Sequence, residues 1–433
     1  MNLANNAVNF ERENETLVDS KDESFKLSPL AKAGIRIRRF PYPYQAMLAI
    51  CSDLDETPDR QVYFEIMRFL NTTEQTVMGC GVGLEVGNTI YFDMPPTQFA
   101  YWNTDDTGRA MVRELIRSGH IDCLHSYGDL ATTREHIKRA LEELDRHNCH
   151  LKVWVDHGTA PTNFDGDIMK GIGDVPGSPA HHADLTLAYG VEYVWRGRVT
   201  SIIGQNVPRK FAGLGAVSHP FSSGKTILKE FSKGLLGRWG NQKYAMHAGN
   251  RILQKAKLRN GQEIYEFIRC NPHWGGVSSC ETADGIKDVL TPAFLNTLVS
   301  KKAACILYTH LGKISNRDEL LPHKSRQAFA LLASYFTEGK ILVTTTRRLL
   351  GYCRMLEEVS FNVKTVGNVK VVDIQYSGPI QDLDGLCFQM ANSTRLNVSH
   401  NGCALSPVQY HDLANENMSL VSIPWNRLNF PLK

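Results

Sequence analysis

The hydrophobic pattern of residues 43–358 alternates between two periods. Short runs rich in β-branched and aromatic residues are separated by longer segments, several of which repeat apolar residues at helical spacing. The short runs predict strands at MLAICS, NTIYFD, HIDCLH, LKVWVD, VEYVWR, EIYEFIR, ACILYTH and ILVTTT. Strands that alternate with helices are typical of parallel βα units, and their number predicts an α/β fold with a (β/α) barrel of about seven or eight strands.

Two of the longer segments are predicted to be helices. Residues 105–119 carry apolar residues on one helical stripe and end at Gly119, a residue suited to the C-terminus of a helix. Residues 132–148 begin with Thr132 and Glu135, which have the spacing of a capping box. Both segments directly precede a predicted strand, as crossover helices do.

The two ends of the chain have different patterns. Residues 1–42 are polar, acidic at first and then basic, and are predicted to form an N-terminal extension. In residues 359–433 the runs VKVVDIQYS, LCFQMAN and LNVSHNG lie between turn residues and show little helical period. This pattern predicts a small β-rich C-terminal module.

Composition narrows the class of protein. The chain has 433 residues, of which 42% are hydrophobic and 21% charged, as in ordinary folded proteins. The formal net charge of +3 is too small to favour nucleic acid as a partner. The sequence shows neither a signal-peptide pattern at its start nor an apolar run long enough for a transmembrane segment, so a cytoplasmic protein is expected.

One segment departs from this charge balance. Residues 204–260 contain eleven Lys and Arg but a single acid, Glu230, and are treated as a basic insertion in the barrel. Such a block predicts contact with an anionic surface or an anionic substrate, for example a phosphate-linked or nucleotide-linked glycan. The alternative is a solvated helical surface with its basic residues on one side.

Ionisable residues follow five of the predicted strands. In a parallel barrel the carboxyl ends of the strands converge on one rim, where active sites lie. Carboxylates and imidazoles without thiolates are the donors that zinc, cobalt or nickel select. The residues at these strand ends are Asp53, Asp55, His125, Asp156, His157, Arg196 and His310, and the carboxylates and imidazoles among them predict a divalent metal site with zinc as the first choice.

The acids of LAICSDLDE support this prediction. Asp53 and Asp55 are two residues apart, so on an extended backbone both side chains point the same way. Two neighbouring carboxylates repel each other, and a cation beside them removes that cost.

Several of these residues resemble motifs of the polysaccharide deacetylase superfamily, also called the NodB-homology or carbohydrate esterase family 4 fold. Asp53 and Asp55 resemble its first motif, which supplies a catalytic base and a metal ligand. HSYGD resembles the second motif, with His125 in place but Asp129 where a second histidine is usual. CILYTHLGK resembles the last motif, with His310 at the position of the general acid. The arginine of the third motif is missing from VDHGTAP.

The resemblance implies a deacetylase-type barrel and hydrolysis of an N-acetyl amide, or an O-acetyl ester, on a sugar or glycan precursor. It implies Asp53 as the base, His310 as the acid, and Asp55 and His125 as metal ligands. The third ligand is left open between Asp129 and His157. We prefer His157, because a residue at a strand end is held more rigidly than one that follows a glycine.

Two further residues are predicted to bind the substrate. Arg196 follows the strand VEYVWR, and Trp274 in NPHWGG can stack on a sugar ring. The alternatives are a glycoside hydrolase or a non-sugar amidase on the same barrel, or a glycan-binding protein that has lost its activity.

Overall fold

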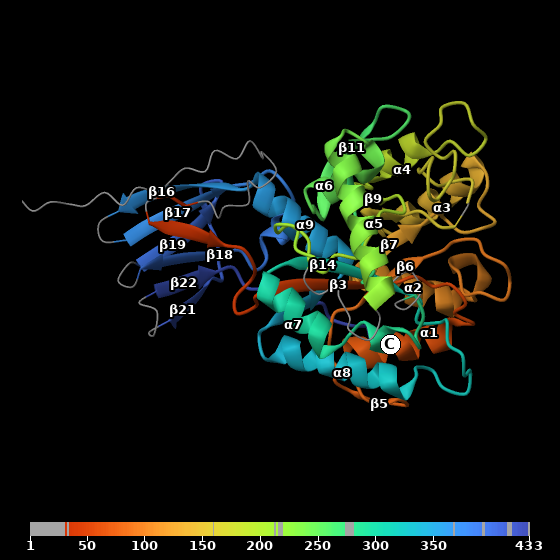
Figure 1. Cartoon of the computed structure of the whole chain (residues 1–433), viewed down its shortest axis with the longest axis horizontal. Helices are drawn as coiled ribbons and strands as arrows, with labels where there is room; N and C mark the ends of the chain where they lie inside the picture. Colours follow the sequence, from red (N-terminus) through yellow and green to blue (C-terminus); the bar gives the residue numbers. More distant parts are fainter. Residues whose placement is uncertain are drawn as a thin grey trace, which may run out of the picture.

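The computed structural model describes residues 31–32, 34–158, 160–211, 214, 220–272, 281–366, 369–391, 395–413 and 418–431. Figure 1 shows two parts side by side, an α/β part on the right and a β-rich part on the left. The mixed α/β class and the β-rich C-terminal part are confirmed.

An eleven-stranded sheet forms the centre of the α/β part. Its order is β10-β13-β14-β3-β6-β7-β8-β9-β12-β11, and β15 also pairs with β3. Neighbouring strands are parallel, except that β11 is antiparallel to β12. Over the described residues this order does not close into a ring, so a complete (β/α) barrel of the deacetylase type is not confirmed. The strands are β3 (Ala46–Ser52), β6 (Gly87–Ile90), β7 (Ile121–His125), β8 (Val153–Val155), β9 (Tyr193–Trp195), β10 (Val199–Thr200), β11 (Leu253–Lys257), β12 (Glu263–Phe267), β13 (Arg269–Cys270), β14 (Ala304–Thr309) and β15 (Ile341–Thr344).

The sequence of strand β3 is an almost continuous apolar run because both faces of the strand are buried. Met47, Ala49 and Cys51 belong to one buried cluster, while Leu48 and Ile50 belong to another. Both faces of the strand are therefore covered, as is usual in parallel sheets.

Helices connect and cover these strands. The predicted helix at 105–119 forms as α2 and is followed by Gly119, whose φ of 82° ends the helix as expected. The helix predicted at 132–148 forms as α3, but its capping residue is Thr133 instead of Thr132. The one-residue shift makes His136, not Glu135, the residue that accepts from the backbone N–H of Thr133, at 3.3 Å. The helices are α1 (Arg60–Asn71), α2 (Asp106–Arg117), α3 (Arg134–Arg146), α4 (Ala183–Tyr189), α5 (Pro220–Arg238), α6 (Ala245–Ala248), α7 (Pro292–Lys301), α8 (His323–Thr337) and α9 (Thr346–Glu358).

The β-rich part contains two sheets. One has the order β1-β2-β18-β22-β21 and the other β16-β17-β19-β20. Strands β1 and β2 lie within the predicted N-terminal extension, and Ile37 of β2 pairs with Phe388 of β18. None of the described helices combines the length and the apolar character that a bilayer-spanning segment needs. The strands are β1 (Ala31–Lys32), β2 (Ile35–Arg38), β16 (Ser360–Val366), β17 (Val369–Gln375), β18 (Cys387–Ala391), β19 (Arg395–His400), β20 (Cys403–Ala404), β21 (Gln409–Leu413) and β22 (Met418–Ser422); a separate hairpin pairs β4 (Gln75–Thr76) with β5 (Gly79–Cys80).

Candidate active site

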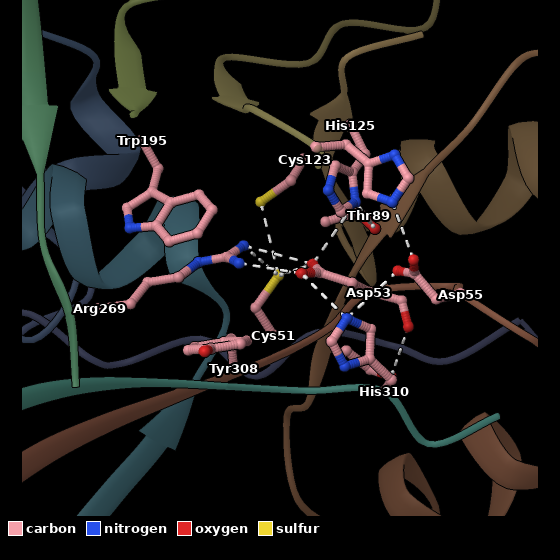
Figure 2. A network of polar contacts seen from close by, with 12 residues as sticks. Cys51, Asp53, Asp55, Thr89, Cys123, His125, Trp195, Arg269, Tyr308 and His310 are labelled. Carbon is pink, nitrogen blue, oxygen red and sulfur yellow. Dashed lines mark hydrogen bonds and ion pairs between the residues drawn. The ribbon is translucent and has the colours of Figure 1, made fainter. Parts of the chain in front are cut away.

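Polar side chains from five strands of the central sheet meet at one end of that sheet (Figure 2). The sequence predicted this convergence for four of the strands, since residues at the carboxyl ends of parallel strands share one edge. The fifth strand, β13, contributes a residue that was not predicted. The set is Asp53 and Asp55 after β3, His125 at the end of β7, His157 after β8, Arg269 in β13 and His310 after β14.

Asp53 lies at the centre of this network. Its carboxylate accepts hydrogen bonds from Nη1 and Nη2 of Arg269, at 2.9 and 3.3 Å. The Nδ1 atom of His125 lies 3.7 Å from one oxygen, and Nε2 of His310 lies 3.9 Å from the other. Burial acts to raise the pKa of Asp53, but the charges of Arg269, His125 and His310, together with the hydrogen bonds from Arg269, outweigh it and the pKa is lowered. The carboxylate is thus kept ionised in a buried position.

Arg269 places a positive charge beside Asp53, and none of the deacetylase-like sequence motifs contains this residue. Its side chain is fully buried, and its guanidinium lies 4.4 Å from the ring centre of Trp195 and 5.3 Å from that of Tyr308. The segment VDHGTAP after β8 contains no arginine, and the guanidinium that contacts Asp53 comes from β13. The signal was present in the sequence, because Arg269 ends the predicted strand EIYEFIR.

Asp55 faces a different set of partners. One oxygen is 2.9 Å from Nε2 of His157, and the other accepts from the hydroxyl of Tyr91 at 2.7 Å and lies 3.3 Å from Nε2 of His310. Burial opposes ionisation, but the contacts with His157 and His310 lower the pKa of Asp55. Asp55 is therefore also ionised, with partners separate from those of Asp53 except for His310.

Asp129 lies behind His157. Its Oδ1 atom is 3.0 Å from Nδ1 of His157, while Nε2 of the same ring faces Asp55. Burial lowers the pKa of His157, but the two carboxylates outweigh it and raise the pKa to about 10. A carboxylate on the far nitrogen of a ligand histidine fixes the orientation of the ring. The two carboxylates therefore hold the His157 ring in its protonated form with Nε2 turned toward Asp55, and the ring would have to lose a proton before it could bind an ion.

His125 packs among aromatic rings. Its ring stacks on Tyr91 at 4.6 Å and meets the ring of His157 edge-on at 4.8 Å. Its Nδ1 atom lies 3.1 Å from Oγ1 of Thr89. Burial lowers the pKa of His125 to about 3, so the ring is neutral at physiological pH, which is the form that binds a metal.

His310 is held by the backbone. Its Nδ1 atom donates to the carbonyl oxygen of Glu281 at 2.6 Å, which leaves Nε2 facing the carboxylates of Asp53 and Asp55. Burial lowers the pKa of His310, but the contacts with Asp55 and Asp53 outweigh it and raise the pKa. A protonated imidazole in this position is able to donate a proton from Nε2.

A second group of metal-type donors lies behind Asp53. In the described part of the chain, the three donors whose atoms all lie within 4.8 Å of one another are Cys51, Asp122 and Cys123, and not the predicted set. Burial raises the pKa of the Cys123 thiol and raises that of Asp122 to about 6, so charged donors are disfavoured here. Arg269 also places a guanidinium nitrogen 3.7 Å from the Cys51 sulfur. A cation next to this guanidinium would be repelled, and we treat the group as part of the core.

The predicted metal ligands lie close together, but they do not form a preformed metal site. Asp55 and His157 contact each other directly, and the ring of Tyr91 touches both histidines. Oxygen and two imidazole nitrogens suit zinc, cobalt or nickel in chemical type. Binding an ion between Asp55 and His157 requires their atoms to move apart.

The predicted substrate residues have other surroundings. Arg196 donates to Glu266 at 2.9 Å, and no described hydrogen bond or ion pair links it to Asp53 or Asp55. Trp274 lies outside the described residues. Asp156, which also follows β8, is fully buried and accepts from the Trp154 indole at 2.7 Å, and burial raises its pKa to about 8.

The chain shows little similarity to known proteins. No protein-family model matches the chain, and no curated protein matches it. A solved structure of an endo-β1,6-glucanase resembles it with a TM-score of 0.34 and 8% sequence identity, over 91% of this chain and 94% of the glucanase chain. A likeness of this size does not indicate a shared fold or activity.

Proposed function

We propose that the protein is a metal-dependent hydrolase that removes an acetyl group from a sugar or glycan precursor. The observation that carries the proposal is the pairing of two ionised carboxylates with different partners. Asp53 is held by Arg269, whereas Asp55 faces two imidazoles of the predicted metal site. One acid is thus available to accept a proton and the other to bind an ion.

Asp55, His125 and His157 would hold the ion, for which zinc is the first candidate and cobalt or nickel the alternatives. When bound, such an ion lowers the pKa of a water molecule from about 15.7 to about 7 and polarises a carbonyl group. Asp129 keeps the Nε2 atom of His157 turned toward Asp55.

The remaining residues would move protons. Asp53, ionised because of Arg269, accepts the proton of the attacking water. His310, with its raised pKa, then donates a proton from Nε2 to the departing amine. Its Nδ1 contact with the Glu281 carbonyl keeps Nε2 directed at the site throughout.

The main competing function is glycoside hydrolysis with paired carboxyl groups. That chemistry needs one carboxylic acid with a raised pKa to protonate the leaving oxygen. The pKa values of Asp53 and Asp55 are both lowered, so neither suits this role. The pKa of Asp156 is raised to about 8, but its carboxylate accepts from the Trp154 indole and from the backbone N–H groups of Phe164 and Asp165, and no described hydrogen bond links it to Asp53 or Asp55. A non-sugar amidase would use the same groups as a deacetylase, and only the substrate distinguishes the two.

The test combines metal analysis with an acetate-release screen over nucleotide sugars and acetylated oligosaccharides. We expect a divalent ion in the wild type and in a His150→Ala control, because His150 is exposed and lies outside the site. Asp55→Ala should lose both the ion and acetate release. A wild-type protein that takes up no divalent ion on titration would refute the proposal. Release of reducing sugar that a chelator does not affect would favour the glycosidase.

A further inference from the structure

Helix α5 exposes large apolar side chains over its whole length. The exposed fractions are 93% for Phe221, 66% for Leu228, 54% for Phe231 and 73% for Trp239, which directly follows the helix. Phe221, Leu228 and Trp239 recur at roughly helical spacing, so they share one side of the helix. In Figure 1 the helix lies in front of the central sheet, on the near surface of the molecule. Exposed apolar groups of this number on one element usually mark an interaction surface.

The same surface is positively charged. Lys225, Lys229 and Arg238 are exposed between these apolar residues. The one acid of the helix, Glu230, is fully buried. We define the α5 face as Phe221, Lys225, Leu228, Lys229, Phe231, Leu236, Arg238 and Trp239; it contains apolar and basic residues and no acid.

The opposite side of the helix is anchored, which fixes the direction of the α5 face. Glu230 accepts from the hydroxyl of Thr200 at 2.9 Å, from the backbone N–H of Ser201 at 3.2 Å and from Nζ of Lys233 at 2.8 Å. Lys233 also donates to the carbonyl of Val199 at 2.8 Å. These contacts tie the helix to β10, so it cannot roll its apolar residues inward without breaking buried charged contacts.

We propose that the α5 face docks on a membrane surface that carries anionic lipid. A helix with Phe, Leu and Trp beside Lys and Arg is suited to the boundary between headgroups and acyl chains, where apolar side chains insert and basic ones meet negative headgroups. A second copy of the chain fits less well, since two α5 faces would bring their cations together. The docking is peripheral and does not depend on the function proposed above.

The experiment is co-sedimentation of the full chain with vesicles. Vesicles of phosphatidylglycerol and phosphatidylcholine in equal amounts are compared with phosphatidylcholine alone, at low salt and at about 1 M salt, where charge interactions are screened within about 3 Å. We expect binding to the anionic vesicles that weakens at high salt. The double variant Lys225→Glu/Lys229→Glu should weaken it about tenfold or more, since each basic residue near such a surface contributes roughly 1 kcal/mol.

Matched variants separate this surface from others. Phe221→Ser/Trp239→Ser should also weaken binding, while Val77→Ser, at a position 76% exposed on another part of the chain, should leave it unchanged. Lys364→Glu, an exposed lysine of β16, is the control for charge. Thermal midpoints equal to that of the wild type show that each variant is folded.

Three results would overturn the inference. The first is the absence of binding to anionic vesicles at low salt. The second is binding that both double variants leave intact. The third is a wild-type dimer in solution that the same double variants dissociate, which would identify a second copy as the occupant of the α5 face.

Discussion

Replacing Arg269 by Met removes the guanidinium that contacts Asp53 and leaves a similar volume between Trp195 and Tyr308. In the wild type both members of the pair are buried, and two nitrogens of the arginine contact the carboxylate at 2.9 and 3.3 Å. Asp53 then keeps two imidazoles at 3.7 and 3.9 Å, beyond hydrogen-bond distance, and a weak contact with the Cys51 thiol at 4.0 Å.

The expected loss of stability is large. Removing one partner of a buried ion pair costs about 3–5 kcal/mol, because the other charge stays buried without compensation. Replacing both partners by apolar residues of similar volume is often neutral. Arg269→Met should therefore lower the free energy of unfolding by about 3–5 kcal/mol, whereas Asp53→Leu/Arg269→Met should lower it by much less.

The loss should also depend on pH in a defined direction. In the wild type the lowered pKa of Asp53 means that the pair stabilises the fold above about pH 4, and that this contribution is lost as the pH falls through the folded value. Without Arg269, burial raises the pKa of Asp53 above its unfolded value. The penalty of the variant is then greatest at neutral pH and shrinks as the pH falls toward about 4, since protonation relieves it.

Urea unfolding of the wild type, both single variants and the double variant, at several pH values, measures these quantities. A coupling energy below about 0.5 kcal/mol, which is the usual scatter for independent sites, would refute the reasoning. So would a destabilisation by Arg269→Met that is the same at acidic and at neutral pH. Arg269→Lys keeps the charge but loses the two-point contact, and it should fall between the wild type and Arg269→Met.

Three other variants test the remaining groups. Asp129→Asn should weaken metal affinity about 10–100-fold, measured by competition with a chromogenic chelator, and unchanged affinity would mean that Asp129 does not orient His157. His310→Ala should retain the ion but lower kcat for acetate release by about 10²–10⁴-fold, and a loss of the ion would instead make His310 a ligand. Glu230→Ala should lower the free energy of unfolding by about 3 kcal/mol, the lower end of the range for a buried pair, because Lys233 loses its carboxylate partner but is partly exposed and keeps its contact with the Val199 carbonyl. Burial raises the pKa of Glu230, but His247 and Lys233 outweigh it and lower the pKa to about 2. The contribution of Glu230 to the free energy of unfolding is therefore complete above about pH 4.5 and should be lost as the pH falls toward 2, as measured by urea unfolding.

The strands that carry Asp53, Asp55, His125, His157 and His310 were predictable because each is a buried run that ends at an ionisable residue. β3 is buried on both faces, and its apolar run stops where Asp53 begins. His125 and His310 follow the same rule. Period and strand order in the sequence fix which residues reach the edge of a parallel sheet, and this requires no knowledge of long-range contacts.

Arg269 was missed for a different reason. It lies 216 residues from Asp53 in the sequence, and nothing local to either residue indicates the pairing. The pair requires only that a guanidinium reach the buried carboxylate oxygens, and any strand that ends near Asp53 can provide one. Some strand pairings could not be predicted from the local sequence either. Strands β10 and β13 have two residues each, too few for a periodic hydrophobic pattern. Strand β2 pairs with β18, which lies near the other end of the chain.

Asp53 and Asp55 start from almost the same point of the backbone, and the structure gives them separate neighbours. Arg269 reaches Asp53 from β13, while His157 reaches Asp55 from β8, and Asp129 in turn contacts His157. Because each carboxylate has its own cationic partner, their mutual repulsion is compensated without forcing either one to take up a proton. The roles that we propose for them, base for Asp53 and ion-binding acid for Asp55, are compatible with this separation although the two residues stand two positions apart, and Arg269, which no sequence motif named, is one of the residues that maintain it.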